Sequence, residues 1–328
     1  MRTLHKILRI AGSVCVVLFS VAFGAQAKGF PDRALTLVVP FSTGGGHDFT
    51  ARLLASKLNS YLGQQVIVVN KPGADGMIGA QYVSRAKPDG YTIMMSSPAE
   101  TVIAPFLYKS MSYDPSKDLS PITLVSTTPI ALVANPSFPP NTLPELVAYV
   151  KAHPGKVDYG MPGVGSAQQL AVDWIERSTG IKILAIPYKG AGPATIDVLG
   201  GQIPLASVGM APVIPHWKAG KLKVLCIMNN KRLAWLPKVP TASETPGAGA
   251  VDVVQWMGLF APAGTPAAII NKLNAAVEKV LHDPAVKKTL IAQGVEPVGS
   301  SVKNFSIFLT HERKKYAALV KASGISVK

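Results

Sequence analysis

The chain has 328 residues, with 33 Lys and Arg against 18 Asp and Glu, which gives a formal net charge of +15. This length is enough for two modest domains. The basic residues form no block and no basic strand interleaved with aromatic side chains, so we exclude nucleic acid as a partner. A diffuse positive field that attracts small anions explains the charge better, with a merely solvated basic surface as the alternative.

The first 27 residues predict a cleaved secretory signal peptide. Arg2, Lys6 and Arg9 form a basic start, a mostly apolar run follows, and the Ala-Gln-Ala at 25–27 is typical of a cleavage site. Loss of these three bases would leave 30 Lys and Arg against the same 18 acids, a net charge of +12. Cleavage would also leave Cys226 as the single cysteine, which excludes an internal disulfide, and its apolar neighbours predict a buried inert thiol. No later stretch has the length and apolar character of a membrane span, so we expect a secreted protein.

Residues 35–62 predict a strand, a glycine-rich turn and a helix in direct succession. The run 35–39 is apolar and β-branched, as in a strand buried on both faces, and Pro40 ends it. The apolar spacing from Phe49 predicts a helix with Asp48 as its N-cap. Backbone N–H groups at such a helix start lack internal partners, glycines let a ligand approach them, and the helix dipole favours an anion. The stretch therefore predicts either an anion site, most simply for a carboxylate, or a tight turn that binds no ligand.

The glycine-rich turn fits neither of two common phosphate-binding loops. No Lys follows the glycines, as a G-x-x-x-x-G-K-[ST] loop requires. The pattern G-x-G-x-x-G also fails, because Gly44 and Gly46 are followed by Phe49 and Thr50. The next strand ends in Asn70 rather than in an acid that could hold a ribose, so we disfavour nucleotide binding.

Strands and helices continue to alternate through the first hundred residues. We predict, in chain order, a strand at 65–70, a turn at 71–76, a helix at 77–85, a turn at 88–90 and a strand at 91–96. This alternation is typical of a parallel sheet with right-handed crossovers, in which the loops at 41–48, 70–76 and 96–101 meet at one edge. The two apolar runs in 119–134 are together long enough to leave one lobe and enter another.

The middle of the chain repeats the strand, glycine turn and helix arrangement twice. The strand 157–160 leads through Gly165 into a helix with Ser166 as its N-cap, and the strand 182–186 leads into a helix opened by Pro193. The other elements predicted after residue 134 are helices at 143–151 (with Thr142 as N-cap), 266–281, 284–293 and 302–322, and strands at 205–208, 222–228 and 253–260.

Six segments of the chain carry a family resemblance. They read PFSTGGGHDFTAR from Pro40, VVNKPGADGMIGA from Val68, KPDGYTI from Lys87, GVGSAQQLA from Gly163, IPYKGAGPATIDVLGGQI from Ile186 and WMGLFAPAGTP from Trp256. In this order, and over nearly the whole chain after the signal peptide, they resemble the Bug receptors, the periplasmic substrate-binding proteins of tripartite tricarboxylate transporters. The resemblance implies an α/β fold with the two-lobed architecture of periplasmic binding proteins (a Venus flytrap), each lobe a mostly parallel sheet flanked by helices.

The resemblance also implies a site and a role. We assign 28–127 with 230–328 to lobe 1 and 128–229 to lobe 2, with the chain returning near 229–237. A small carboxylate would be clamped between the lobes and delivered to integral membrane transporter subunits, by a periplasmic monomer that needs no metal and no cofactor. The ligand-binding residues that the resemblance implies are Phe41, Ser42, Thr43, Gly44, Gly45, Gly46, Asp48, Gly73 and Ala74 in lobe 1 and Gly165, Ser166, Tyr188, Lys189 and Gly190 in lobe 2.

Three segments depart from the pattern usual in the family that this chain resembles. Thr43 stands where the first loop commonly has a proline, and Asp75 and Met77 depart from a Gly-Ala-Gly-Gly-Asn sequence in the second loop. Gln169 stands where a histidine is common. An additional acid and a lost basic or amide group near the cleft argue against a plain dicarboxylate ligand, unless Asp75 faces solvent.

Two other functions remain open. A receptor that docks on a membrane sensor would have the same fold and cleft. A periplasmic hydrolase has little support, because the neighbours of Ser166 do not form G-x-S-x-G. The histidines also show no metal-ligand spacing, and for His47, the one expected in the cleft, a surface or capping role is favoured; the histidines after the signal peptide are His47, His153, His216, His282 and His311.

Overall fold

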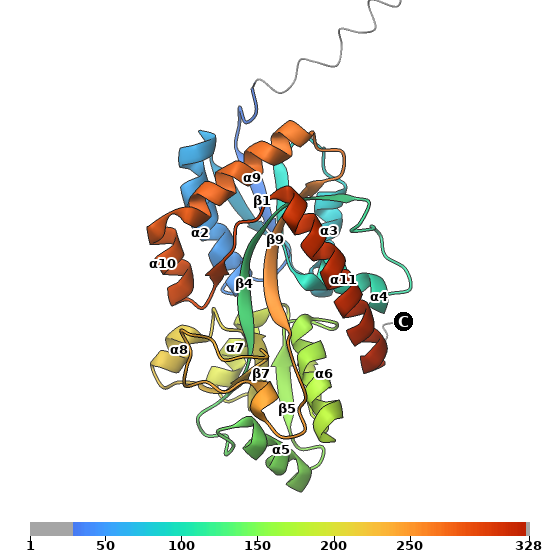
Figure 1. Ribbon diagram of the computed structural model, residues 1–328, viewed down its shortest axis with the longest axis vertical. Helices are drawn as coiled ribbons and strands as arrows, with labels where there is room; N and C mark the ends of the chain where they lie inside the picture. Colours follow the sequence, from blue (N-terminus) through green and yellow to red (C-terminus); the bar gives the residue numbers. More distant parts are fainter. Residues whose placement is uncertain (1–28, 326–328) are drawn as a thin grey trace, which may run out of the picture.

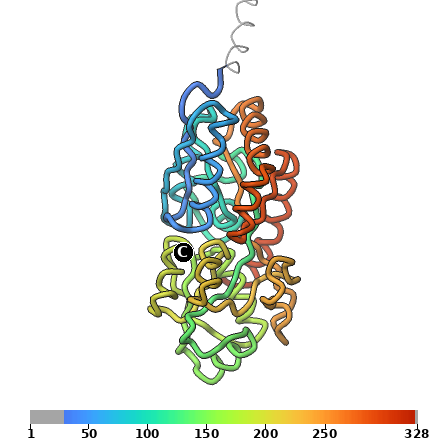
Figure 2. The backbone as a smooth tube through the Cα atoms, turned by 90° about the vertical axis from the view of Figure 1, so that its left-hand side faces the viewer, coloured from blue at the N-terminus to red at the C-terminus, as the bar shows by residue number. Residues whose placement is uncertain are grey.

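The computed structural model describes residues 29–325, so the predicted signal peptide at 1–27 lies outside the described residues. Figure 1 shows two lobes stacked along the long axis of the molecule, with the strands β4 (Leu119–Ala134) and β9 (Val254–Pro262) running from one toward the other. In the view turned by 90°, the segment around β4 again passes between the two lobes (Figure 2). The predicted two-lobed α/β architecture is confirmed.

The first lobe is built on a mixed sheet. Strand β1 (Leu35–Val39) lies between β2 (Val66–Asn70) and β3 (Thr92–Ser96), parallel to both. Next to β3 comes β9 and then β4, each antiparallel to its neighbour, and the short β10 (Glu296–Pro297) pairs with β4. The helices of this lobe are α2 (Gly46–Leu62), α3 (Met77–Ser84), α4 (Ala104–Leu107), α9 (Ala267–His282), α10 (Pro284–Ala292) and α11 (Val302–Ser323).

The second lobe has a sheet of the same kind. Strand β5 (Asp158–Met161) lies parallel to β6 (Leu184–Pro187) and β7 (Leu205–Gly209), whereas β4 runs antiparallel to β7 and to β8 (Lys223–Ile227). Its helices are α5 (Leu143–Ala152), α6 (Ala167–Thr179), α7 (Ala191–Leu199) and α8 (Ile214–Lys218). Neither sheet is mostly parallel as predicted, because β4, which takes part in both sheets, and β9, which takes part in the first, run antiparallel to their neighbours.

Strand β1 shows how the sequence pattern positions the first loop. Leu37 and Val39 point into the core that α2 and α9 cover, whereas Val38 belongs to the core on the opposite face, and all three are fully buried. A strand covered on both faces has no room for polar side chains, which explains its continuous apolar run. The same burial fixes the end of β1, and with it the start of the glycine-rich turn.

Several predicted helix ends are confirmed and two are wrong. Thr142 and Ser166 cap their helices as predicted, accepting hydrogen bonds from the backbone of the first turn. Helix α2 begins at Gly46 with Gly45 as N-cap, so Asp48 lies inside the first turn rather than at the cap. Helix α7 begins at Ala191, before Pro193. The predicted loop at 96–101 instead enters a π-helical turn, η2 (Ala99–Ile103), that continues into α4.

The middle of β4 and the start of β9 form the crossing between the lobes. Thr127 pairs with Trp256 and Thr128 with Gln255, just beyond two register shifts in β4. Trp256 is fully buried, and its Nε1 donates to Glu312 Oε2 of α11 at 2.8 Å. Helix α11 therefore braces the crossing from outside.

Residues 230–253 pack on the second lobe. Leu236 and Val239 lie in its core, Thr241 forms a bridge to Ile227 of β8, and Trp174 Nε1 donates to the Ala248 carbonyl at 3.1 Å. We therefore propose that the chain returns to the first lobe along β9, later than the 229–237 expected from the sequence. Within residues 29–325, none of the helices combines the length and the hydropathy needed to cross a membrane.

Candidate ligand-binding site

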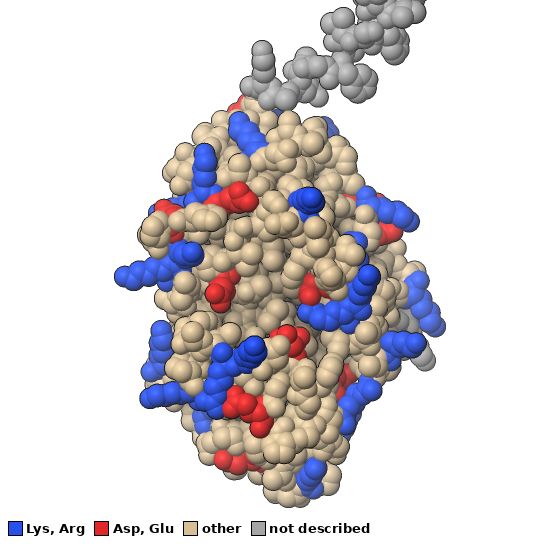
Figure 3. Space-filling model, viewed as in Figure 1, with Lys and Arg blue, Asp and Glu red and all other residues tan. Residues whose placement is uncertain are grey.

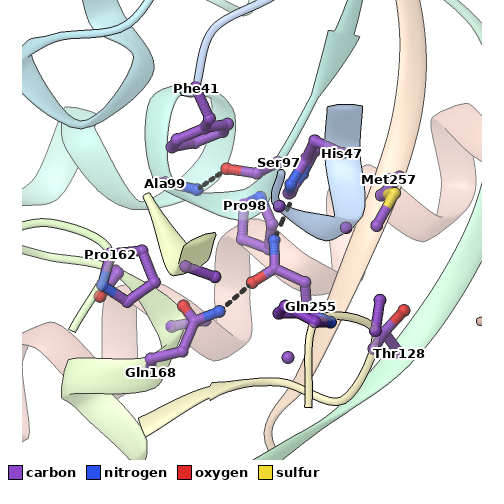
Figure 4. Close-up of a pocket in the computed structure, with 18 of the residues that line it drawn as sticks. Phe41, His47, Ser97, Pro98, Ala99, Thr128, Pro162, Gln168, Gln255 and Met257 are labelled. Carbon is purple, nitrogen blue, oxygen red and sulfur yellow. Dashed lines mark hydrogen bonds between the residues drawn. The ribbon is translucent and has the colours of Figure 1, made fainter. Parts of the chain in front are cut away.

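A cavity lies between the lobes at the crossing of β4 and β9 (Figure 4). The centre of a water molecule can move within about 40 Å³ of this cavity, and a cavity that holds one water needs about 10–15 Å³ by the same measure. The space therefore suits a small solute. Both lobes and both crossing strands line it. The lining residues are Phe41, Ser42, Gly45, Gly46, His47, Asp75, Ser97, Pro98, Ala99, Thr128, Pro162, Ser166, Ala167, Gln168, Ala191, Gly209, Ala211, Pro212, Gln255 and Met257.

Three helices begin at this cavity. The first residues of α2, α6 and α7, namely Gly46, Ala167 and Ala191, all line it. The first turn of a helix presents backbone N–H groups without intrahelical partners and carries the positive end of the helix dipole. Within residues 29–325, the lining contains neither Lys nor Arg. The groups at the cavity that could attract an anion are therefore the helix starts, as expected from the glycine-rich turn.

Glycines allow the two lobes to touch beside the cavity. Ser42 of the first lobe donates from both N and Oγ to the Lys189 carbonyl of the second, at 3.2 and 2.8 Å. A Cβ on Gly192 would lie only 3.0 Å from the Thr43 carbonyl oxygen and 3.2 Å from the carbonyl carbon of Gly44. Any side chain at 192 would thus push the backbones apart, and the structure represents a closed arrangement of the lobes.

A chain of polar side chains crosses the cavity wall. Gln168 Nε2 of α6 donates to Gln255 Oε1 of β9, and Gln255 Nε2 lies 3.4 Å from His47 Nε2 of α2 (Figure 4). With this amide orientation His47 Nε2 accepts, which places the ring proton on Nδ1. Burial lowers the pKa of His47 from 6.5 to about 4, so the ring is neutral at neutral pH. The expected surface or capping role of His47 is wrong.

Two carboxyl groups lie at another part of the wall. Asp75 lines the cavity, and its Oδ1 is buried without a hydrogen-bond partner. Burial, followed by the charge of Glu100, raises the pKa of Asp75 well above its usual range. Glu100 is fully buried and accepts from Ser97 N at 2.6 Å and from Ser97 Oγ at 2.5 Å. Burial raises the pKa of Glu100 to about 7 even though these bonds favour its charged form.

The Asp75 carboxyl group thus forms part of the cavity wall and does not point into open solvent. Gln169, another departure from the family pattern, does not line the cavity: its Oε1 accepts from Gly165 N at 2.6 Å and holds the turn before α6. Asp173 lies farther along α6, where burial raises its pKa to about 6, and it lines a separate groove with Trp174.

The structure brings only part of the predicted site together. Five of the predicted residues line the cavity, namely Phe41, Ser42, Gly45, Gly46 and Ser166. Three line an adjoining outer groove, namely Thr43, Gly44 and Asp48, and four line a second groove beside Asp75, namely Gly73, Ala74, Tyr188 and Lys189. The last two are packing contacts: a Cβ on Gly165 would meet Leu107, and a Cβ on Gly190 would meet the backbone of Ser42.

Two of the predicted polar side chains are occupied elsewhere. The Asp48 carboxylate is bound by Arg52, by Asn70 and by the Gly44 amide, so it organises the first loop. Tyr188 donates its hydroxyl to Asp197 Oδ2 at 2.7 Å. Both residues shape the loops around the cavity, and neither lines it.

Three polar side chains that line the cavity were not predicted from the sequence, namely Thr128, Gln168 and Gln255. Gln168 stands two residues after the Ser166 cap, a position that could have been inferred because the first turn of α6 faces the cavity. Thr128 lies in the middle of β4 and Gln255 is the second residue of β9, and no turn or cap motif marks either of them. Among residues 29–325, no group of three or more His, Cys, Asp or Glu side chains could hold a metal ion.

The face of the molecule seen in Figure 3 has no single basic patch, formed by the described residues, that could bind an anion in place of the cavity. Lys and Arg side chains there are spread over both lobes and interspersed with Asp and Glu. This distribution fits the diffuse field predicted from composition rather than a single basic patch.

Known proteins are similar to this chain over nearly its whole length. Residues 50–325 match the family described as "Tripartite tricarboxylate transporter family receptor". Protein BugT of Bordetella pertussis is 34% identical over 324 residues, covering 98% of this chain and 99% of BugT. A solved R. palustris protein with adipate has a TM-score of 0.86 at 31% identity, covering 90% of this chain and 99% of its own. MatC from Rhodopseudomonas palustris with bound malate has a TM-score of 0.84 at 32% identity, covering 89% and 100%.

Proposed function

Because this chain belongs to the receptor family of tripartite tricarboxylate transporters, we propose that it captures a small carboxylate between its lobes and delivers it to the membrane subunits of such a transporter. The family consists of periplasmic solute-binding receptors, which are not enzymes. The partners of this chain, its monomeric state and cleavage after residue 27 are parts of the same proposal.

The single observation that carries the proposal is the meeting of three helix starts at one cavity whose lining, among residues 29–325, contains neither Lys nor Arg. Gly46, Ala167 and Ala191 contribute the amides, and the relatives solved with adipate and malate hold carboxylates. Hydrogen bonds to a charged group contribute about 1.5–3 kcal/mol each. Three or four of them would account for about 8 kcal/mol, or micromolar affinity, once ordering costs are subtracted.

Closure of the lobes would trap the ligand. The contacts between Ser42 and Lys189 and between Thr43 and Gly192 form only when the lobes are together, because they join different lobes. A ligand that touches both lobes stabilises the closed state relative to an open one. We propose the middle of β4 and the start of β9 as the hinge, with 128–229 and the segment up to β9 moving as one body.

The test is a thermal-shift screen of the purified chain with small organic acids, including malate and adipate, against uncharged compounds of similar size. We expect at least one carboxylate to raise the melting temperature in a concentration-dependent way. Shifts with uncharged compounds and none with any carboxylate would overturn the proposal. Pull-down from membrane extracts with the liganded receptor would then separate a transporter partner from a sensor.

A hydrolytic role finds no geometric basis. The Ser166 hydroxyl is the N-cap of α6 and accepts from Gln169 N at 3.3 Å. A serine nucleophile needs a base within about 2.6–3.2 Å of its oxygen, and among residues 29–325 no hydrogen bond joins Ser166 to a histidine or an acid. We therefore propose that the chain binds its ligand without converting it.

A further inference from the structure

We propose that the cavity selects carboxylates that also carry an ammonium group, and that Asp75 is the residue that pairs with this group. The inference rests on the proposed function, since it adds a second requirement to the ligand of the same cavity. It identifies a specificity-determining side chain at a site whose other recognition comes mainly from the backbone.

The Asp75 carboxyl group is held in the cavity wall by an unusual turn. Ala74 and Asp75 both adopt positive φ angles, 45° and 51°, which side chains with a Cβ rarely occupy. Such backbone strain concentrates at ligand-binding positions. Across the interface, Gly163 makes room for the carboxyl group, because a Cβ there would lie 2.2 Å from Asp75 Oδ1. The turn and the glycine together fix an acid between the lobes.

The carboxyl group at this position lacks the partners that a buried acid needs. Asp75 Oδ1 has no hydrogen bond, and the nearby Ser97 amide and hydroxyl both donate to Glu100 instead. Lys189 lines the same outer groove as Asp75, but no ion pair joins the two among residues 29–325. Buried polar atoms in native proteins are nearly always satisfied. Oδ1 lies against Gly163, so a hydrogen-bond donor on the ligand would reach Oδ2, the accessible oxygen of the same carboxyl group.

The acids and phenols around Asp75 favour a cation over an anion. Glu100 acts on Asp75 by charge repulsion, and burial, followed by the charges of these acids, raises the pKa of Tyr108 and of Tyr113. A second ligand carboxylate placed here would add another negative charge beside two acids. An ammonium group would instead neutralise one of them and relieve the repulsion.

Asp75 lies at one end of the cavity, and the starts of α2 and α7, which would bind the carboxylate, lie at the other. Phe41, Pro162 and Asp75 are shared with the outer groove on one side, whereas Gly45, Gly46 and Ala211 are shared with the groove on the other. Phe41 and Pro162 lie on the left of the cavity in Figure 4, and Met257 and Thr128 lie on its right. A ligand with its carboxylate at the starts of α2 and α7 would therefore extend its other end toward Asp75.

Thr128 supplies a second independent sign that the cavity accommodates a polar ligand. Its side chain is 2% exposed, lines the cavity, and has an Oγ1 without a hydrogen-bond partner. A hydroxyl can donate to a carboxylate or accept from an ammonium group. Two unsatisfied polar atoms in one small cavity point to a ligand with polar groups at more than one position.

The experiment compares probes that differ only by an ammonium group, by calorimetric titration of the full chain. The pairs are L-aspartate against succinate and 4-aminobutyrate against butyrate. We expect the amino member of at least one pair to bind about tenfold tighter or more, and Asp75→Asn to remove that preference. Asp75→Ser guards against an effect of the amide alone, and Asp89→Asn, which alters an exposed acid paired with Arg33, should leave the preference intact.

The outcomes separate this inference from the proposed function. Equal or tighter binding of the plain carboxylates, or an unchanged preference in Asp75→Asn, would overturn the role of Asp75 while leaving carboxylate capture standing. Binding of uncharged compounds with no response to any carboxylate would overturn both. Melting curves of each variant establish that the chain remains folded.

Discussion

The two ends of the cavity recognise charge by different means. At the starts of α2 and α7, Gly46 and Ala191 offer backbone amides, whose positive potential is the same at any pH. At the other end Asp75 and Glu100 offer side chains whose charge depends on burial and on each other. Substitutions at the first end should therefore change ligand affinity by changing the shape of the backbone. Substitutions at the second end should change how stability and affinity depend on protonation. The predictions below test that difference, beginning with the largest effect.

At the amide end, Gly192→Val should weaken carboxylate binding by up to about 100-fold. A Cβ at this position would lie 3.0 Å from the Thr43 carbonyl oxygen across the closed interface, and overpacking of this kind costs about 1–3 kcal/mol. Gly200→Val, at the exposed opposite end of α7, is the matched control. Titration with a carboxylate found in the screen measures both. Equal affinities for the two variants would show that closure does not require this contact.

At the acid end, the stability of the folded chain should decrease as the pH rises from 4.5 to 7. Burial raises the pKa of Glu100 from 4.5 to about 7, so the folded chain binds more protons than the unfolded chain in this window. Ionisation through it costs about 3 kcal/mol. Because Asp75 is coupled to Glu100, the measured titration belongs to the pair.

Glu100→Gln should remove most of this loss. Denaturant melts at pH 4.5, 6 and 8 measure the free energy of unfolding, and the variant should gain on the wild type toward pH 8. Glu296→Gln, at an exposed position of β10, serves as the control and should follow the wild type. A variant whose pH profile parallels that of the wild type would mean that Glu100 is not the group that titrates.

His47, on the first turn of α2, should have the opposite effect on the pH dependence of stability. Burial lowers its pKa from 6.5 to about 4, so the folded chain binds fewer protons than the unfolded chain between these values. Stability is fully present above pH 6.5 and falls by about 3 kcal/mol as the pH drops through 4. His47→Gln retains an acceptor for Gln255 and should flatten the acid limb of the profile. An NMR titration showing His47 protonated near pH 6.5 would contradict the prediction.

The difference between the ends also explains what the sequence could predict. The strand, turn and helix at 35–62 and the caps Thr142 and Ser166 follow from local patterns, so the amide end was found. The helix start itself was misplaced, because Asp48 looks like an N-cap but bonds to Arg52 and Asn70.

The side-chain part of the cavity could not be found from local patterns. Thr128 and Gln255 meet only because β4 and β9 pair across more than a hundred residues, in a register that no local signal sets. Asp75 adopts a positive φ that its residue type disfavours, so propensity argued against its actual geometry. The antiparallel orientation of β4 and β9 was likewise not predicted, because the apolar pattern of a long strand does not indicate the direction of its neighbours.

The smallest effect concerns a single hydrogen bond between the lobes. Ser42→Ala removes the 2.8 Å bond from its Oγ to the Lys189 carbonyl, while the bond from Ser42 N remains. A bond of this kind contributes about 0.5–1.5 kcal/mol, so carboxylate affinity should fall less than about tenfold. Ser56→Ala removes an equally long bond, to the Leu53 carbonyl, within one lobe and should leave affinity unchanged. If both variants bind the carboxylate equally well, closure depends on the glycine contacts and the ligand rather than on this hydroxyl. Recognition at the amide end would then come from the backbone alone.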